Sequence, residues 1–545
     1  MAVAKYKQLI GRKVLEVLKN HNYNINPASI ENAVTLNKNQ LQFELPVESL
    51  LKSNVNETHC RDLLNITIKE DGAIRNVAKS TSKPSEEDKI LFSVNEEHFV
   101  KDVLQNRDYF HELGDLSLRK GPRTRKKVLI EYSSPNVAKP FHMGNFRSTI
   151  IGNYLSNIHD YFQHDVVRLT YLGDWGKQFG LLQIGLDDLK LSEDETLQNP
   201  IETLFKAYVA ANRRAEKDSD VLRRANEIFH AMETGRNEEV LKRWETVRRV
   251  TVDELSETYR RLGVSFDDYD WESNYPASTA ATYIDALREK GKIRDEDGKQ
   301  VFILDSGKTI PLLKSDGSSL YLTRDVVAAV TRKARFDFDE TLYVVDFSQE
   351  EHFVALRNIL TEFDPSWAEL IKHVKFGPTK DDLPEYVTDV LGVSAVMVND
   401  LKQRRMKDYN FDWNSALQVT GDSGIKLQYT HCRLVSLEQN CGFELNEYCF
   451  DKCDSLLDPA VVQLVHQIAR FDDVMADSFR TFESFHIVNY LFKLCNTISK
   501  AMKTLPVKDA PNRDIGLQRL LVFHSARIVL NRGMRVLGLK PLEKM

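Results

Sequence analysis

The sequence predicts an α/β protein with a doubly wound, parallel-sheet (Rossmann-like) domain, a small α/β domain before it and an all-helical bundle after it. The strand-like segment Lys126–Tyr132 leads through a Pro- and Gly-containing turn into a helix-like stretch. A second strand and a second Gly-punctuated turn follow within Asp165–Leu182. Strand, turn, helix and strand with glycines at strand ends are typical of a doubly wound sheet, whose ligand crevice lies at the carboxyl ends of the strands.

The length of 545 residues suggests about three domains. We predict a small α/β domain at 1–120 and the doubly wound domain at 121–425. A charged helical insertion is expected at about 195–295, after which strands resume at "QVFIL", "SLYLTRDV" and "TLYVVDF". From about Leu427 apolar residues recur at helical spacing to the end of the chain, which predicts a helical bundle at 426–545.

The composition narrows the class of protein. A hydrophobic content of 42% and a charged content of 28% are typical of a soluble globular protein. A net charge of −6 argues against a protein that coats nucleic acid by charge alone, but it allows a local basic face. The six cysteines form no zinc-type pairing, so we expect reduced thiols and no protein-bound metal. The sequence contains no run of about 18 apolar residues, so we predict no membrane span.

The first twenty residues, "MAVAKYKQLIGRKVLEVLKN", are basic with apolar positions at helical spacing. Two interpretations fit this pattern. The stretch is either an organelle-targeting segment or the first helix of the folded N-terminal domain.

The stretch "SSPNVAKPFHMGNFRSTIIGNYL" (Ser133–Leu155) carries the chemistry. A helix N-terminus offers unpaired N–H groups and a partial positive charge. Gly144 there lets a phosphate approach the backbone, His142 can donate to a phosphate oxygen, and Lys139 adds a cation. Ser134–Asn136 offer hydroxyl and amide groups at the strand end. Neither GxxxxGK[ST] nor GxGxxG is present, so these residues alone favour a plain cap and turn over nucleotide binding.

Several long motifs in order carry a resemblance. They are the stretch above and "YLGDWGKQFGLL", "YLTRDVVAA" (Tyr321–Ala329), "YVVDFSQEEHF" (Tyr343–Phe353), "LQYTHCRLVSLE" and the terminal "LGLKPLEKM". Together they resemble a class I aminoacyl-tRNA synthetase, more narrowly an arginyl-tRNA synthetase, and most closely the mitochondrial type. The resemblance extends from about residue 85 to Met545, and more loosely over the residues before.

The resemblance implies an arginine–tRNA ligase that uses ATP with Mg²⁺, L-arginine and tRNA-Arg, as a monomer in the mitochondrial matrix or, alternatively, in the cytoplasm. It implies catalytic roles for His142, Asn145 and Lys139, and an ATP site made by these residues and Gly144. The implied arginine site is Ser134, Pro135, Asn136, Asn145, Tyr321, Asp325 and Gln349. The implied tRNA contacts are Tyr429, Arg433 and Met545. Tyr321 and Asp325, four residues apart, are expected on one helix face.

The sequence departs from the family pattern in two places. Asn145 stands where the family signature His–x–Gly–His has its second histidine. After Gly377 the chain lacks the mobile loop with a Lys–Met–Ser–Lys-like motif, and Lys139 is the candidate to replace its lysine. Two hypotheses therefore stay open: a working arginine–tRNA ligase, or a catalytically impaired tRNA-binding relative or isoform.

Overall fold

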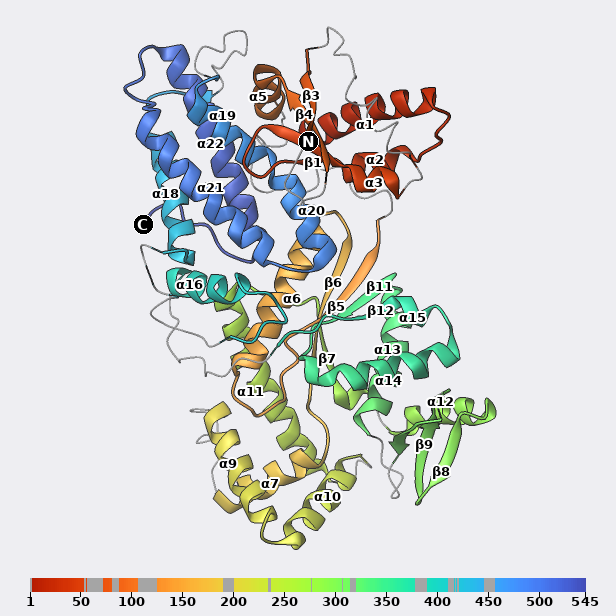
Figure 1. Ribbon diagram of the computed structural model, residues 1–545. Coiled ribbons are helices and arrows are strands. Elements are labelled where there is room, and N and C mark those ends of the chain that lie inside the picture. Colours follow the sequence, from red (N-terminus) through yellow and green to blue (C-terminus); the bar gives the residue numbers. More distant parts are fainter. Residues whose placement is uncertain are drawn as a thin grey trace. The chain divides into compact units, whose positions relative to one another are not determined.

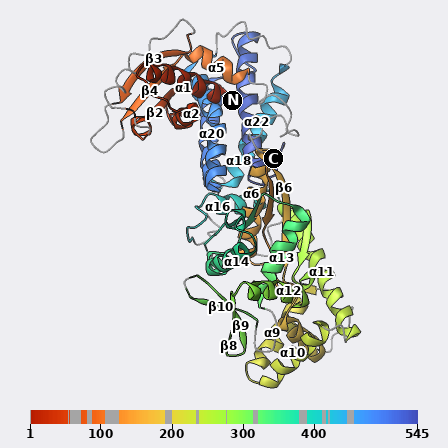
Figure 2. The same cartoon turned by 90° about the vertical axis from the view of Figure 1, so that its right-hand side faces the viewer.

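In this computed structural model the described residues are 2–52, 55, 72–80, 88–105, 125–189, 200–233, 237–275, 277–305, 307–313, 320–377, 390–409, 416, 418, 421–445 and 456–545. They fall into two compact units. One contains Met1–Arg119, Leu417–Arg535 and Pro541–Met545, and the other contains Lys120–Ala416 and Val536–Lys540. Figures 1 and 2 show the elements of each unit from two sides.

A five-stranded parallel sheet organises the second unit, in the order β12-β11-β5-β6-β7. Its strands are β5 (Lys127–Glu131), β6 (Asp165–Leu172), β7 (Asp268–Trp271), β11 (Glu340–Tyr343) and β12 (Ile371–His373). The first strand, β5, is central. The chain adds β6 and β7 on one side and then β11 and β12 on the other, so the doubly wound prediction is confirmed. The direction of winding reverses between β5 and β11, which is where such sheets bind ligands.

Helices cover this sheet and fill the insertion after β6 (Figure 1). They are α6 (Met143–Tyr161), α7 (Lys177–Leu189), α9 (Pro200–Ala215), α10 (Ser219–Glu233), α11 (Glu238–Leu262), η4 (Glu272–Asn274), α12 (Ala277–Glu289), α13 (Tyr321–Phe336), η5 (Phe347–Gln349), α14 (Glu350–Phe363), α15 (Trp367–Leu370) and α16 (Val390–Leu401). The helix α6 is buried along most of its length. A Cβ on Gly152 would lie 2.1 Å from the Tyr132 ring, so this glycine lets α6 approach the end of β5.

Three details of the predicted order are wrong. The core strand β7 lies inside the segment predicted as a helical insertion. The segment "QVFIL" forms β9 (Lys299–Ile303) in a separate antiparallel sheet with β8 (Ile293–Glu296) and β10 (Thr309–Leu313). The predicted strand "SLYLTRDV" is helical from Tyr321 onward, because Leu322, Val326 and Ala329 share one buried face at helical spacing.

The N-terminal part of the first unit is a four-stranded antiparallel sheet, β1-β2-β4-β3, with helices. Its elements are α1 (Ala2–Asn20), α2 (Pro27–Ala33), β1 (Thr35–Leu36), β2 (Gln42–Pro46), α3 (Val47–Leu51), β3 (Ile74–Ser80), β4 (Lys89–Val94) and α5 (Glu96–Leu104). Tyr6 of α1 is buried and stacks on Phe43 of β2, with ring centroids 5.7 Å apart. Of the two interpretations of the first twenty residues, the structure therefore agrees with the folded first helix.

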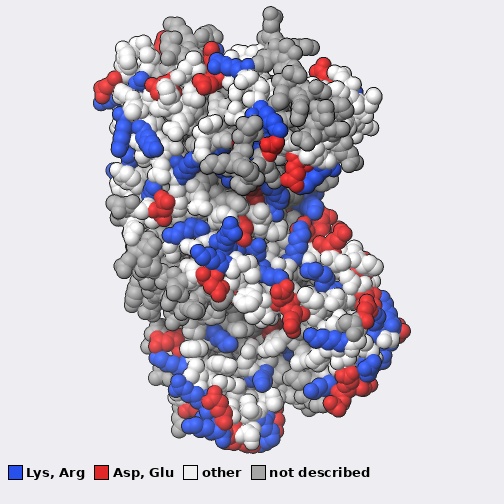
Figure 3. Space-filling model, in the orientation of Figure 1, with Lys and Arg blue, Asp and Glu red and all other residues white. Residues whose placement is uncertain are grey.

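The rest of the first unit is helical, as predicted, with α18 (Gly424–Asn440), α19 (Pro459–Ala469), α20 (Phe471–Thr481), α21 (Phe485–Thr504) and α22 (Arg513–Val536). Cys432, Cys441 and Cys495 are buried free thiols. Across the described ranges no helix has the length and hydropathy needed to cross a membrane. Figure 3 shows acidic and basic side chains interspersed on the face in view. The domain boundaries at 120 and 425 stay predictions.

Candidate active site

A cleft of about 350 Å³ lies at the carboxyl ends of β5, β11 and β12. The start of α6 forms one side of it. The lining residues are Ser133, Ser134, His142, Gly144, Asn145, Ser148, Val344, Val345, Asp346, Phe376 and Gly377. The cleft therefore opens at the point where the winding of the sheet reverses, and it is large enough for a small organic ligand.

His142 and Asn145 close the first turn of α6 as a reciprocal cap. The Asn145 backbone N–H donates to His142 Nδ1 over 3.4 Å, and the His142 backbone N–H donates to Asn145 Oδ1 over 3.3 Å. The Asn145 side-chain amide also reaches the Ser133 carbonyl oxygen at 3.5 Å. Asn145 therefore has a structural task at the helix start that needs no charge. A neutral imidazole that accepts at Nδ1 carries its proton on Nε2, so His142, which is exposed, presents Nε2–H as a donor.

Two hydroxyl groups fix the start of α6 to two strands. Ser148 Oγ accepts from the Ser133 backbone N–H at 2.9 Å and donates to the Val344 carbonyl at 2.7 Å. Thr149 Oγ1 lies 2.7 Å from Ser133 Oγ. Ser133 and Ser134 both have positive φ angles, of 69° and 41°. Non-glycine residues held in this region cluster at functional sites, because the surrounding structure must enforce the conformation.

Arg147, one turn further along α6, is a buried connection to the opposite wall. It is 1% exposed and its Nε lies 3.0 Å from Asp400 Oδ2. The Arg147 guanidinium also donates to the Gly377 carbonyl and, at 3.4 Å, to the Arg405 carbonyl. Burial raises the pKa of Asp400, although the Arg147 charge opposes this. Arg147 therefore holds Gly377, which lines the cleft, in a fixed place beside α6.

Lys139 is half-buried and does not line the cleft. Its Nζ lies 5.5 Å from the ring centroid of Tyr208 on α9, a cation–π contact. The structure therefore brings His142, Gly144, Asn145 and Ser134 together in the cleft, with Lys139 turned to the insertion. The sequence departure after Gly377, where the mobile loop of the family pattern is expected, falls on residues 378–389. These residues lie outside the described part of the chain.

The predicted substrate side-chain residues lie on α13 and at the start of α14. Tyr321, in the first turn of α13, is 57% exposed, and Gln349 is exposed at the end of η5. Asp325, one turn after Tyr321, has its Oδ2 2.7 Å from Nε2 of His352 on α14. The predicted i, i+4 placement of Tyr321 and Asp325 on one helix is thus present.

Glu272, which the sequence pattern did not single out, is the second carboxylate of this region. Its side chain is 12% exposed, and its nearest cation is Arg324, whose Nη1 lies 3.9 Å from Glu272 Oε2. That oxygen accepts no hydrogen bond among the described residues. Burial, and then the negative charge of Asp325, raise the pKa of Glu272 to about 8, although Arg324 opposes this. A buried carboxylate whose only recorded ion pair among the described residues is a long one, and which lies in electrostatic range of a second carboxylate, is a place where a cationic ligand is favoured.

A buried ion-pair network connects the carboxyl end of β5 to β7 and α13. Arg332 of α13 binds Glu131 of β5 at 2.6 Å and Asp270 of β7 at 2.7 Å. Burial raises the pKa of Glu131, and its other oxygen accepts from Ser134 Oγ at 3.3 Å. The Tyr171 backbone N–H in turn donates to Ser134 Oγ at 3.1 Å. Ser134 is therefore held between two strands by groups that reach α13.

Comparisons with known proteins identify this arrangement. Residues 113–383 match the family described as the catalytic domain of class I (R) tRNA synthetases, and residues 427–545 match the DALR anticodon binding domain. The probable mitochondrial arginine–tRNA ligase of Homo sapiens is 34% identical over 92% of this chain and 93% of its own. The cytoplasmic arginine–tRNA ligase of Saccharomyces cerevisiae is 36% identical over 77% of each chain. The chain belongs to the arginyl-tRNA synthetase family.

The fold agrees with that of other arginyl-tRNA synthetases. The superposition on the Thermus thermophilus arginyl-tRNA synthetase includes 99% of this chain and 100% of that one, with a TM-score of 0.78 and a sequence identity of 18%. This similarity agrees with the predicted order of folds along the chain: an α/β N-terminal part, a doubly wound domain and a helical C-terminal part.

The residues predicted to contact tRNA, Tyr429, Arg433 and Met545, lie on α18 and in the C-terminal tail. Tyr429 is 52% exposed, and the Arg433 guanidinium lies 5.6 Å from its ring centroid. Among the described residues Arg433 has no carboxylate within ion-pair distance. The Leu542 carbonyl accepts from His431 Nδ1 at 2.7 Å, which fixes the tail that ends at Met545 to the same helix. These three predicted residues are therefore exposed on one part of the bundle.

Pro135 and Asn136 complete the predicted set. Pro135 is buried and Asn136 is exposed. Asn136 forms an isolated parallel bridge with Gly173 at the end of β6, where a Cβ on Gly173 would lie 2.3 Å from Asn136 Oδ1. This segment therefore lies at the strand ends, with the Asn136 side chain packed against a glycine.

Proposed function

We propose that this chain activates L-arginine with ATP and transfers the arginyl group to tRNA-Arg. The observation that carries the proposal is the pairing of a helix-start cleft at the sheet switch point with two carboxylates, Asp325 and Glu272, in the same unit. The helix-start cleft suits the phosphates of a nucleoside triphosphate, and the two carboxylates suit a guanidinium.

On the ATP side, catalysis is chiefly positioning and charge stabilisation of an in-line displacement. His142 donates from Nε2 to a phosphate oxygen, Gly144 lets the phosphates approach the helix start, and Asn145 holds both in place. A Cβ on Gly144 would lie 3.1 Å from the His142 ring, so a larger residue would displace the histidine. Lys139 leaves Tyr208 to bind the departing pyrophosphate. Mg²⁺ bound with ATP would supply further neutralisation of the phosphate charge.

On the arginine side, Asp325 and Glu272 bind the guanidinium, and Tyr321 covers it. Ser134, Pro135, Asn136 and Gln349 line the remainder of the substrate site. A guanidinium favours the ionised form of Glu272, so arginine binding releases a proton near neutral pH. His352 holds one oxygen of Asp325, which leaves the other for the substrate.

On the tRNA side, Tyr429, Arg433 and Met545 contact the anticodon arm, with aromatic stacking on unpaired bases as the physical basis. The protein acts as a monomer in the mitochondrial matrix. Mitochondrial and cytoplasmic arginine–tRNA ligases are both similar to this chain, so fractionation of cells that express the full chain is the test of this location.

A catalytically impaired tRNA-binding protein is the less favoured alternative. The relatives that this chain matches over most of their length are named as arginine–tRNA ligases.

The test is arginine-dependent charging of tRNA-Arg by the purified full chain, with Lys139→Ala alongside. We expect charging by the unaltered chain and a large loss in the variant. Tight tRNA binding without charging at high ATP and arginine would overturn the proposal.

A further inference from the structure

Side chains of the helical bundle hold the turn between β1 and β2, and the turn and the bundle belong to one compact unit. Lys493 of α21 donates from Nζ to the Lys38 carbonyl at 2.8 Å, and Arg470, beside α20, reaches the same oxygen at 3.5 Å. His466 Nε2 lies 2.9 Å from the Asn37 carbonyl. Asn39 Oδ1 of the same turn accepts from Lys493 Nζ at 3.0 Å, and the Lys38 side chain takes no part in these bonds.

This junction has an excess of positive charge. Within the described ranges, no carboxylate forms an ion pair with Lys38, Arg470 or Lys493. Lys493 has a lowered pKa, because of burial first and then the positive charges of Arg470 and Lys38. The three cations therefore raise one another's energy, as in a site that awaits an anion.

The acidic groups in electrostatic range of Arg470 are already neutralised. They are Asp473 and Asp477. Asp473 pairs with Lys7 at 2.7 Å and Asp477 pairs with Arg480 at 2.5 Å. The positive charge at the junction is thus not compensated from these neighbours.

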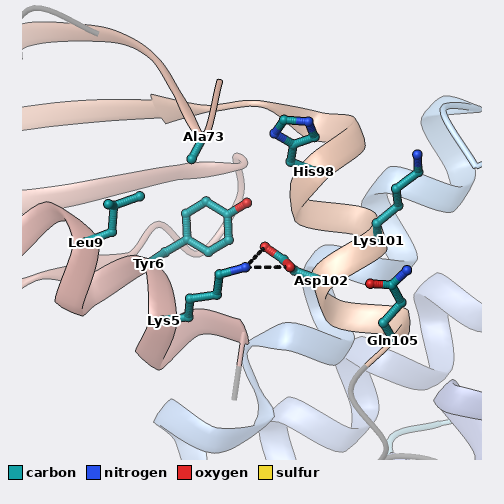
Figure 4. Close-up of a pocket in the computed structure, with 8 residues that line it drawn as sticks. All are labelled: Lys5, Tyr6, Leu9, Ala73, His98, Lys101, Asp102 and Gln105. Carbon is teal, nitrogen blue, oxygen red and sulfur yellow. Dashed lines mark hydrogen bonds and ion pairs between the residues drawn. The ribbon is translucent and has the colours of Figure 1, made fainter. Parts of the chain in front are cut away.

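A cavity in the N-terminal domain shows the contrast. It has a volume of about 410 Å³ and lies between α1 and α5. Figure 4 shows Lys5 directed at the Asp102 carboxylate, with Nζ–O distances of 2.7 and 2.9 Å. Lys101, which also lines it, pairs with Glu97 at 3.0 Å. The lysines of that cavity pair with carboxylates, whereas those of the junction have no carboxylate partner among the described residues.

We propose that Lys38, Arg470 and Lys493 form a binding site for a backbone phosphate of tRNA. The inference rests on the proposed function for the identity of the polyanion. Binding to this site releases counterions, so it contributes affinity that falls as salt rises. Because the site joins the β1–β2 turn to α21, a bound phosphate also strengthens the junction between the two parts of the unit.

Lys38→Gln and Lys493→Met test the site by equilibrium binding of tRNA-Arg to the full chain over a range of salt concentrations. We expect each to weaken binding by about threefold to tenfold at low salt and to reduce the slope of log K against log salt by about 0.7–0.9. Lys493→Arg keeps charge and donors and is expected to bind as the unaltered chain does. Lys52→Gln is the matched control, since Lys52 pairs with Glu48 at 2.8 Å.

The variants separate a phosphate site from a purely structural junction. Lys38→Gln leaves every bond of the junction in place, so a loss of affinity in this variant supports the phosphate site. Unchanged affinity and salt slope in Lys38→Gln would overturn the phosphate site. This holds even if Lys493→Met binds tRNA weakly, because that loss could come from a loosened turn. Charging at saturating tRNA by all variants, with unchanged binding, would leave the proposed function intact while removing this inference. Absence of charging by the unaltered chain would remove the proposed function instead.

Discussion

The two halves of the candidate active site are built in opposite ways. At the start of α6, the groups that form the helix cap beside the cleft are uncharged side chains with hydrogen-bond partners: His142 and Asn145 cap one another, and Ser148 bonds to two strand ends. Around α13 the groups are carboxyls and incompletely satisfied: Glu272 Oε2 accepts no hydrogen bond among the described residues, and Asp325 bonds to His352 through one oxygen. Neutral groups can position a highly charged phosphate chain without binding it too tightly. Uncompensated carboxylates select a cation, because their cost of burial is recovered only when it binds.

The largest expected effect comes from breaking the connection between α6 and the opposite wall. Arg147→Met removes the partner of buried Asp400 and the donor to Gly377, so we expect a loss of unfolding free energy of roughly 3–5 kcal/mol. Chemical denaturation measures it. The double variant with Asp400→Leu removes the unpaired charge and should recover part of this loss. A single variant as stable as the unaltered chain would contradict the role given to Arg147.

The next effect concerns the charged half and its pH dependence. Since the pKa of Glu272 is raised to about 8, the free protein holds this carboxyl protonated at pH 6, and a guanidinium must displace the proton. Arginine affinity should therefore rise with pH up to about 8, by at most tenfold per unit. Calorimetry of arginine binding in buffers of different ionisation enthalpy should show proton release at pH 7.

Glu272→Gln gives the control for this dependence. The variant should bind arginine more weakly, and its affinity should be flat between pH 6 and 8. In the unliganded protein the same raised pKa stabilises the fold fully below about 4.5, and that contribution is lost as the pH rises through about 8. An arginine affinity of the unaltered chain that does not change over this range would contradict the carboxylate assignment.

The smallest effect concerns the neutral half. Asn145→Ala removes one side of the cap of α6 and should cost about 1 kcal/mol of stability, measured by thermal unfolding. Asn145→Ser restores an acceptor and should recover part of it. The ATP KM should rise in Asn145→Ala, because His142 loses its fixed orientation, while the arginine KM changes less. An equal rise of both would mean that the cap does not separate the two halves.

The residues of the neutral half were named from one continuous motif, whereas in the charged half the resemblance implied Asp325 and Tyr321 and did not indicate Glu272. Ser134, His142 and Gly144 follow one strand in a continuous motif, so local pattern was enough to place them. Glu272 follows the short strand β7, which the charged helices around it concealed, and only burial beside Asp325 distinguishes it. The segment "SLYLTRDV" was wrongly predicted as a strand because short apolar runs with Val and Thr fit either structure. Lys139 was placed in the site, whereas its contact with Tyr208 depends on the fold of the insertion.

The central claim is that one half of the site binds ATP and the other selects arginine, and steady-state charging of tRNA-Arg by Asp325→Asn and His142→Asn tests it most directly. Asp325→Asn should raise the arginine KM with about a 100-fold loss of kcat/KM and leave the ATP KM close to that of the unaltered chain. His142→Asn should lower kcat with little change in the arginine KM. Arginine and ATP constants that change together in both variants, or an unaltered chain that does not charge tRNA-Arg, would contradict the account.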